Sequence, residues 1–194
     1  DLGSVRDVSL MEVLADLLPE RVGSLLSINS LREDLEVSHK AVSHWLDVLD
    51  RLYFTFRLSP FISKRVRSIK KDRKLYLWDY SAIPDKSARI ENLVASHLLK
   101  FCHFLEDTEG NRIELRFLRD KEKREVDFLV VVDRKPWFAV EVKAGKGNVS
   151  SRLPYFGDRL GIPFLYQVAW DVGSSHMRDD VFVLSPEDFL GALR

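Results

Sequence analysis

The sequence predicts a mixed α/β protein made of two parts, an N-terminal winged helix-turn-helix and a C-terminal core ordered α-β-β-β-α-β. Three observations lead to this fold class. Helix caps and one-sided apolar spacing dominate the first third, a series of longer strand-like runs begins at residue 113, and the pattern breaks between residues 80 and 87. We therefore place one domain at residues 1–84 and a second at residues 85–194.

Composition and cysteine usage narrow the class of protein. The 194 residues are 45% hydrophobic and 31% charged, with 30 basic and 30 acidic side chains, which is typical of a globular chain with a buried core. No apolar run approaches the ~20 residues of a membrane span, so we expect no membrane crossing. The single cysteine, Cys102, excludes an internal disulfide and a cysteine-based zinc site and favours the cytoplasm. The chain opens Asp-Leu-Gly, which suggests a piece of a longer protein without a signal peptide.

The first third predicts three short helices and a two-stranded wing. An amphipathic segment at residues 10–18 gives the first helix, and Ser30 with Glu33 forms a capping box for the second, through residue 36. Ser38 caps the third helix, whose apolar positions have the spacing of one buried stripe. Short strands at residues 54–58 and 75–78 complete a winged-helix plan. The stripe consists of Val42, Trp45, Leu46, Leu49 and Tyr53.

The second part predicts a sheet with helices. A helical stripe between residues 90 and 105 precedes strands at 113–118, 125–132 and 137–143. A helix at 150–160 and a strand at 163–168 follow, and together with the preceding strand they make a βαβ unit. The chain ends with a strand at 181–184 and a helix capped by Ser185 with Pro186 at its first position.

A basic stretch lies between the two wing strands. Residues 57–74 contain eight lysines and arginines and one acid, a balance that suits phosphate contacts of a nucleic-acid binder. The simpler alternative is a solvated loop, with the winged helix as a packing or interaction module. The candidate nucleic-acid-binding residues are Lys64, Arg65, Arg67, Lys70 and Lys71.

Strand register brings acidic residues together. If a three-residue turn at 133–135 joins the two strands, Val132 faces Pro136 and paired positions sum to 268. Asp127 then faces Glu141, and Glu125 faces Lys143, all on one side of the sheet. Opposed carboxylates repel, which favours a divalent cation between them.

Lys143 extends this site toward phosphodiester chemistry. It lies two residues after Glu141 on the same strand, where its ammonium can stabilise charge on a scissile phosphate. The alternative is a cross-strand ion pair between Glu125 and Lys143 with solvated acids.

These residues resemble a known superfamily. Glu125-Val-Asp127-Phe followed by Glu141-Val-Lys143, with Glu91-Asn-Leu-Val on the preceding helix, resembles the PD-(D/E)xK nucleases. More narrowly, residues 25–170 resemble the C-terminal domain of unknown function of bacterial and archaeal AAA+ ATPases. Val126 stands where the superfamily's name has proline.

The resemblance implies a winged helix followed by a restriction-endonuclease-like core, with an ATPase upstream. It implies Asp127, Glu141 and Lys143 as catalytic residues, and Glu91, Asp127 and Glu141 as ligands of Mg²⁺ or Mn²⁺. Gln167 matches a further polar residue of a late strand.

We therefore expect a Mg²⁺-dependent nuclease-like domain that cleaves or binds DNA and is tethered to an AAA+ ATPase. The alternative is a non-catalytic module that docks nucleic acid or protein for that ATPase. The sequence contains no phosphate-binding Gly-x-x-x-x-Gly-Lys-Ser/Thr motif, so we expect no ATP hydrolysis by this chain itself.

Overall fold

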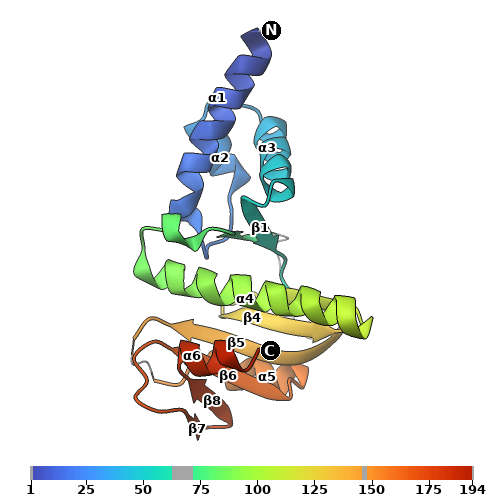
Figure 1. Ribbon diagram of the computed structural model, residues 1–194, viewed down its shortest axis with the longest axis vertical. Helices are drawn as coiled ribbons and strands as arrows, with labels where there is room; N and C mark the ends of the chain where they lie inside the picture. The colour runs from blue at the N-terminus through green and yellow to red at the C-terminus, as the bar shows by residue number, and fades with distance from the viewer. Residues whose placement is uncertain (1, 63–71, 146–147, 194) are drawn as a thin grey trace. The chain divides into compact units, whose positions relative to one another are not determined.

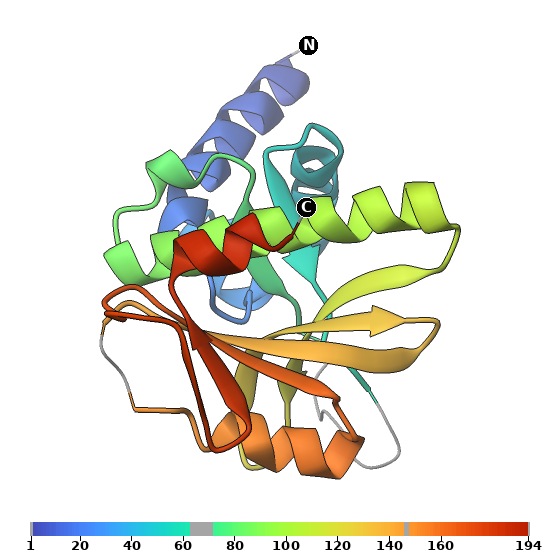
Figure 2. The same ribbon diagram turned by 60° about the horizontal axis from the view of Figure 1, so that its bottom comes forward.

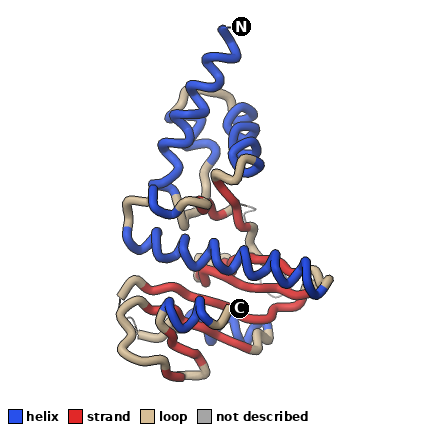
Figure 3. Tube along the Cα trace, viewed as in Figure 1, coloured by secondary structure: helices blue, strands red, loops and turns tan. Residues whose placement is uncertain are grey.

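The computed structural model describes residues 2–62, 72–145 and 148–193 and confirms the mixed α/β class. Helices accompany a mixed six-stranded sheet and a small antiparallel sheet (Figures 1 and 3). Contacts divide these residues into two compact units. The first unit comprises residues 2–57 and 72–92, and the second comprises residues 58–62, 93–145 and 148–193.

The first unit begins with helices, and α3 (His39–Arg51) buries one apolar side. Ser38 caps α3 by accepting a hydrogen bond from the Ala41 amide, as predicted, and four of the five stripe residues are buried. The prediction that Tyr53 is buried with them is wrong, because the helix ends at Arg51 and 71% of the Tyr53 surface is exposed. The elements are α1 (Leu2–Leu17), the 3-10 helix η1 (Leu18–Arg21), α2 (Ile28–Asp34) and α3 (His39–Arg51).

The predicted capping box of the second helix is also corrected. Ser27, not Ser30, caps α2, and its side chain accepts a hydrogen bond from the Ser30 amide. The helix therefore begins at Ile28, three residues earlier than a cap at Ser30 would place it, and it ends at Asp34. Both serines have the chemistry of a cap, so the sequence alone did not separate them.

A small sheet completes the first unit. Strands β1 (Thr55–Leu58) and β2 (Lys74–Leu77) pair, and the segment around Leu25 bridges β2 on an antiparallel path. The 3-10 helix η2 (Tyr80–Ala82) leads to α4 (Lys86–Glu109). On α4, the Asn92 side chain accepts from the Leu77 amide at 2.8 Å and donates to the Leu77 carbonyl at 2.7 Å. This buried amide fixes α4 to β2.

The second unit follows the predicted order α-β-β-β-α-β. Its sheet has the order β3-β4-β5-β6-β8-β7, in which β5, β6 and β8 are parallel and the other neighbours are antiparallel. The short edge strand β7 was not predicted. The elements after α4 are β3 (Ile113–Arg119), β4 (Glu125–Val132), β5 (Lys135–Lys143), α5 (Arg152–Leu160), β6 (Phe164–Ala169), β7 (His176–Arg178), β8 (Val181–Leu184) and α6 (Pro186–Gly191).

Helices cover both faces of this sheet. Figure 2 shows α4 and α5 on opposite sides of it. On the α4 side, Phe101 stacks on Trp137 with ring centroids 6.1 Å apart. On the α5 side, Leu153 and Phe156 pack in a buried cluster with Leu129 and Ala139. The two sides of β5 therefore have different helical neighbours.

The β4–β5 hairpin has the predicted register beyond its bulge, but its turn differs from the predicted one. Asp133 and Arg134 alone form the turn, both with positive φ, so that Val132 pairs with Lys135 and positions near the turn sum to 267. A bulge at Trp137 then adds one residue, and Phe128 pairs with Val140, which restores the sum of 268. The predicted three-residue turn is wrong. The predicted register is right from Val130 to Phe128.

Among the described residues, none of the helices is both long enough and apolar enough to cross a lipid bilayer.

We expect Asn92→Ala to destabilise the protein by about 2–5 kcal/mol, because it leaves the buried amide and carbonyl of Leu77 without their side-chain partner. Urea unfolding would measure the change. Asn111→Ala, in the exposed connection between α4 and β3, is the matched control and should stay within about 0.5 kcal/mol of wild type. Equal stability of the two variants would contradict the role of Asn92.

Candidate functional site

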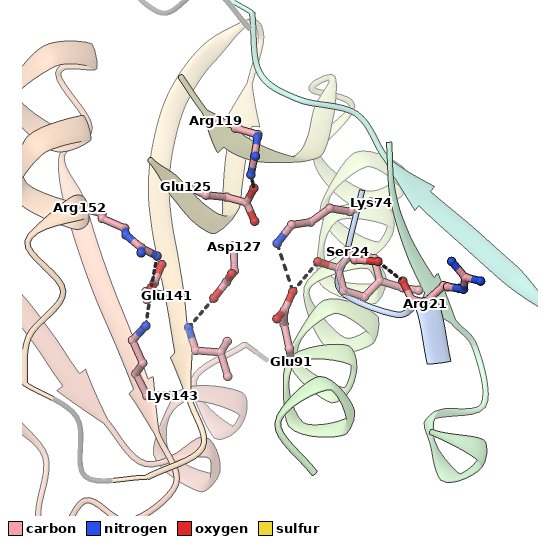
Figure 4. A network of polar contacts seen from close by, with 12 residues as sticks. Arg21, Ser24, Lys74, Glu91, Arg119, Glu125, Asp127, Glu141, Lys143 and Arg152 are labelled. Carbon is pink, nitrogen blue, oxygen red and sulfur yellow. Dashed lines mark hydrogen bonds and ion pairs between the residues drawn. The ribbon is translucent and has the colours of Figure 1, made fainter. Parts of the chain in front are cut away.

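Glu141 is the centre of a buried polar cluster at the carboxyl end of β5. Its side chain is only 2% exposed, and its Oε1 accepts a hydrogen bond from Lys143 Nζ at 2.6 Å. Arg152, the first residue of α5, approaches the same oxygen at 3.8 Å. Figure 4 shows both cations meeting this carboxylate. The other oxygen, Oε2, is buried and has no hydrogen-bond partner in the part of the chain that the structure describes.

Asp127 lies on β4 one step beyond the last paired residues, Phe128 and Val140. Its Oδ2 accepts a hydrogen bond from the Val142 amide at 2.9 Å. A side-chain oxygen therefore replaces the backbone acceptor of the ladder where pairing of β4 and β5 ends. This bond brings the Asp127 carboxylate to β5 between Glu141 and Lys143 (Figure 4).

The positions of these acidic side chains, however, do not follow from strict alternation of residues along β4. The register with β3 shifts between Arg116 and Leu118, so β4 carries an extra residue at 127–128. Val126 and Leu129, three positions apart, consequently join the same buried cluster on the α5 side. The expectation that four charged residues share one face through simple alternation is therefore wrong.

The ion pairs around the site also differ from the cross-strand alternative. Glu125 pairs with Arg119 on β3, while Lys143 pairs with Glu141 on its own strand. A Glu125–Lys143 pair does not form among the described contacts, since Lys143 turns toward the more deeply buried carboxylate.

The environment of Glu141 raises its pKa. Burial is the largest cause, because a charged carboxylate loses hydration, and the charge of Asp127 adds to it. Lys143 and Arg152 act in the opposite direction.

Gln167 holds the segment that leads into α5. It is fully buried and lies beside Glu141 in the parallel register of β5 and β6. Its Oε1 accepts from the Ser150 amide at 2.8 Å, and its Nε2 donates to the Asn148 carbonyl at 3.4 Å. Because Ser150 is two residues before Arg152, these bonds position the start of α5 next to Glu141.

Glu91 belongs to the first unit, whereas Asp127, Glu141 and Lys143 belong to the second. Its carboxylate accepts from Tyr76 Oη at 2.8 Å and contacts Lys74 Nζ at 3.3 Å (Figure 4). Gly23, with φ of +74°, passes so close that an added Cβ would lie 3.3 Å from the carboxylate oxygens. Glu91 is thus an anchor between α4 and β2 within its own unit.

The candidate nucleic-acid-binding residues Lys64, Arg65, Arg67, Lys70 and Lys71 lie outside the described residues. At the ends of the basic stretch, two cations are engaged internally. Arg57 pairs with Asp47 and Asp50, and Lys74, with a 2% exposed side chain, pairs with Glu91.

The chemistry of the donor set fits a divalent cation at Asp127 and Glu141. Hard cations prefer carboxylate oxygens, and Mg²⁺ uses one or two of them together with water and phosphate. Glu141 Oε2 is an oxygen of this kind without a donor in the described chain. No group of three or more His, Cys, Asp or Glu side chains with metal-binding geometry occurs within the described ranges.

Sequence reasoning missed Arg152. No motif announces it, and its only signal is a basic residue two positions after Ser150 at the start of the helix that follows the site strand. Its proximity to Glu141 depends on the packing of α5 against β4, β5 and β6.

Comparison with family models gives two adjoining matches. Residues 1–84 match a domain of unknown function, DUF8612. Residues 86–160 match a second domain of unknown function, DUF4143, which occurs in C-terminal regions of AAA ATPases. Comparison with curated proteins and with solved structures gives no match.

Asp127→Asn should stabilise the metal-free protein at neutral pH by ~1 kcal/mol, since it removes a like charge near buried Glu141 while keeping an acceptor for the Val142 amide. The raised pKa of Glu141 means that the folded state retains a proton that the unfolded state releases, so stability falls as pH rises above the ordinary carboxyl range. The substitution lowers that pKa and should flatten the fall. Urea unfolding across pH measures both effects.

The control for that series is Asp158→Asn on the exposed side of α5, which should change neither the stability nor its pH profile. Destabilisation by Asp127→Asn at neutral pH would show that Asp127 acts through attraction to a cation and not through repulsion of Glu141.

Glu91→Gln should destabilise the metal-free protein by about 3 kcal/mol, because it removes a negative charge that pairs with buried Lys74 while keeping an acceptor for Tyr76. A double-mutant cycle with Lys74→Met measures the coupling and should recover most of the loss. A Glu91 that acts only at a metal site would leave metal-free stability unchanged.

Proposed function

We propose that this chain is the C-terminal region of an AAA+ family ATPase and carries a nuclease-like domain for Mg²⁺-dependent cleavage or binding of DNA. The match of residues 86–160 to a domain of AAA ATPase C-terminal regions supports the first part. The order α4-β3-β4-β5-α5-β6, which is the order of a PD-(D/E)xK core, supports the second.

The buried carboxylate of Glu141 carries this proposal. Burying an ionised carboxylate is unfavourable, and a protein that only needed stability would place an apolar residue there. Glu141 instead lies beside a second carboxylate and has a buried oxygen with no donor in the described chain. Such an arrangement is expected where the two carboxylates bind a cation.

The roles of the residues follow from their positions. Asp127 and Glu141 would hold the cation, with Asp127 oriented by the Val142 amide. Lys143, whose side chain is 35% exposed, can direct its ammonium toward the phosphate that undergoes attack. A bound divalent ion supplies Lewis-acid polarisation of a phosphoryl oxygen.

DNA as the partner rests on two features of the N-terminal half of the chain. The helices α2 and α3 with the paired strands β1 and β2 follow the order of a winged helix. The basic stretch between β1 and β2 contributes candidate phosphate contacts.

A non-catalytic docking module is the second candidate. The observation that favours it is the closed set of ion pairs at Glu141, where Lys143 and Arg152 already offset its charge without a metal. In this case the cluster would stabilise the sheet, and the chain would serve its ATPase by binding alone.

Calorimetric titration with Mn²⁺ separates the two candidates. Asp127→Asn and Glu141→Gln should each weaken binding by about tenfold or more, since each removes a charged ligand. Lys143→Ala should bind Mn²⁺ at least as tightly as wild type while losing cleavage of duplex DNA, because its ammonium acts on phosphate. Asp158→Asn should behave as wild type. Absence of Mn²⁺ binding by the wild-type chain would refute the metal site and favour the docking module.

A further inference from the structure

Arg152 is placed to act at the candidate site, although no motif assigns it a role. Its guanidinium lies 3.8 Å from Glu141 Oε1, and its side chain is 51% exposed. The start of its helix is fixed through the bonds of Gln167 to Asn148 and Ser150. Arg152 thus has a fixed backbone and a side chain with room to move.

The charges at the site balance without any ion. Asp127 and Glu141 contribute two negative charges, and Lys143 and Arg152 contribute two positive charges around them. A divalent cation at the carboxylates would leave two positive charges in excess. Like charges repel, so one or both side-chain cations must turn away from Glu141.

Arg152 is the cation that the geometry selects to move. Lys143 makes a 2.6 Å hydrogen bond to Glu141, whereas Arg152 makes only a longer ionic contact and is the more exposed of the two. Nearby Arg124 is instead held by Asp120 at 2.6 Å and by Tyr155 at 2.8 Å.

We propose that Arg152 is a phosphate-binding residue of this site, which pairs with Glu141 in the metal-free protein and transfers to a phosphodiester group of the substrate when a divalent cation binds. The inference rests on the proposed metal site. A planar guanidinium matches phosphate oxygens in a bidentate fashion, which makes arginine suited to this transfer. Cation and phosphodiester then bind cooperatively, because each restores the charge balance that the other disturbs.

The test uses the full chain, Mn²⁺ and a phosphorothioate thymidine hexanucleotide, which resists cleavage. Calorimetry measures the affinity for Mn²⁺ with and without the oligonucleotide. In wild type the oligonucleotide should raise Mn²⁺ affinity by about fivefold or more, and Mn²⁺ should raise oligonucleotide affinity by the same factor. An uncharged methylphosphonate hexanucleotide should show no such effect.

Arg152→Gln should raise the affinity for Mn²⁺ alone and remove the enhancement of that affinity by the oligonucleotide. Mn²⁺ alone should bind about threefold to tenfold more tightly, because a competing cation is gone. The enhancement by the oligonucleotide should fall to near one. Arg159→Gln, two turns along the same helix and near the Tyr155 ring, is the matched control and should retain the wild-type values.

The outcomes separate this inference from the proposed function. Mn²⁺ binding without enhancement by the oligonucleotide would overturn the role of Arg152 and leave the metal site intact. Enhancement that survives Arg152→Gln would overturn it as well. Absence of Mn²⁺ binding in wild type would overturn both.

Discussion

The structure of the second unit depends on one costly feature, the burial of the Glu141 carboxylate near the end of a central strand. An uncompensated charge at a 2% exposed position would be strongly destabilising. The surrounding chain compensates for it with Lys143 from the same strand and Arg152 from the next helix. The pKa of Glu141 is nevertheless raised, because burial and the charge of Asp127 outweigh the effect of these two cations.

The position of this carboxylate follows from the mixed pairing of β5. On one side β5 is antiparallel to β4, and on the other it is parallel to β6. Pairing with β4 ends at Phe128 and Val140, whereas pairing with β6 continues to Lys143. The end of β5 is therefore paired through its backbone with β6 alone, and on the β4 side the Asp127 side chain accepts from the Val142 amide. The polar side chains of the candidate site therefore lie where the backbone pairing of β4 and β5 ends.

Two neighbouring residues of α4, Glu91 and Asn92, both have a structural role in the first unit. Glu91 contacts Lys74 and Tyr76, and Asn92 binds both backbone groups of Leu77, so consecutive side chains fasten one helix to β2. The resemblance implied a metal ligand at Glu91. Its ion pair with a buried lysine gives this acid a second, local reason to be present.

The sequence by itself determined the order α-β-β-β-α-β, the caps at Ser38 and Ser185, and the pairing sum of 268 found from Val130 to Phe128, because caps and strand periodicity depend on neighbours within a few residues. It reached that sum through a three-residue turn, whereas the protein uses a two-residue turn and a bulge at Trp137, two deviations of one residue that cancel. Only the tertiary structure decided the shift in β4 near Asp127, the choice of Ser27 as a cap, and the approach of Arg152 to Glu141. The shift in β4 and the approach of Arg152 arise from contacts between segments distant in the chain, which a local sequence pattern does not contain. The cap at Ser27 is a local contact, chosen between two serines of equal capping chemistry.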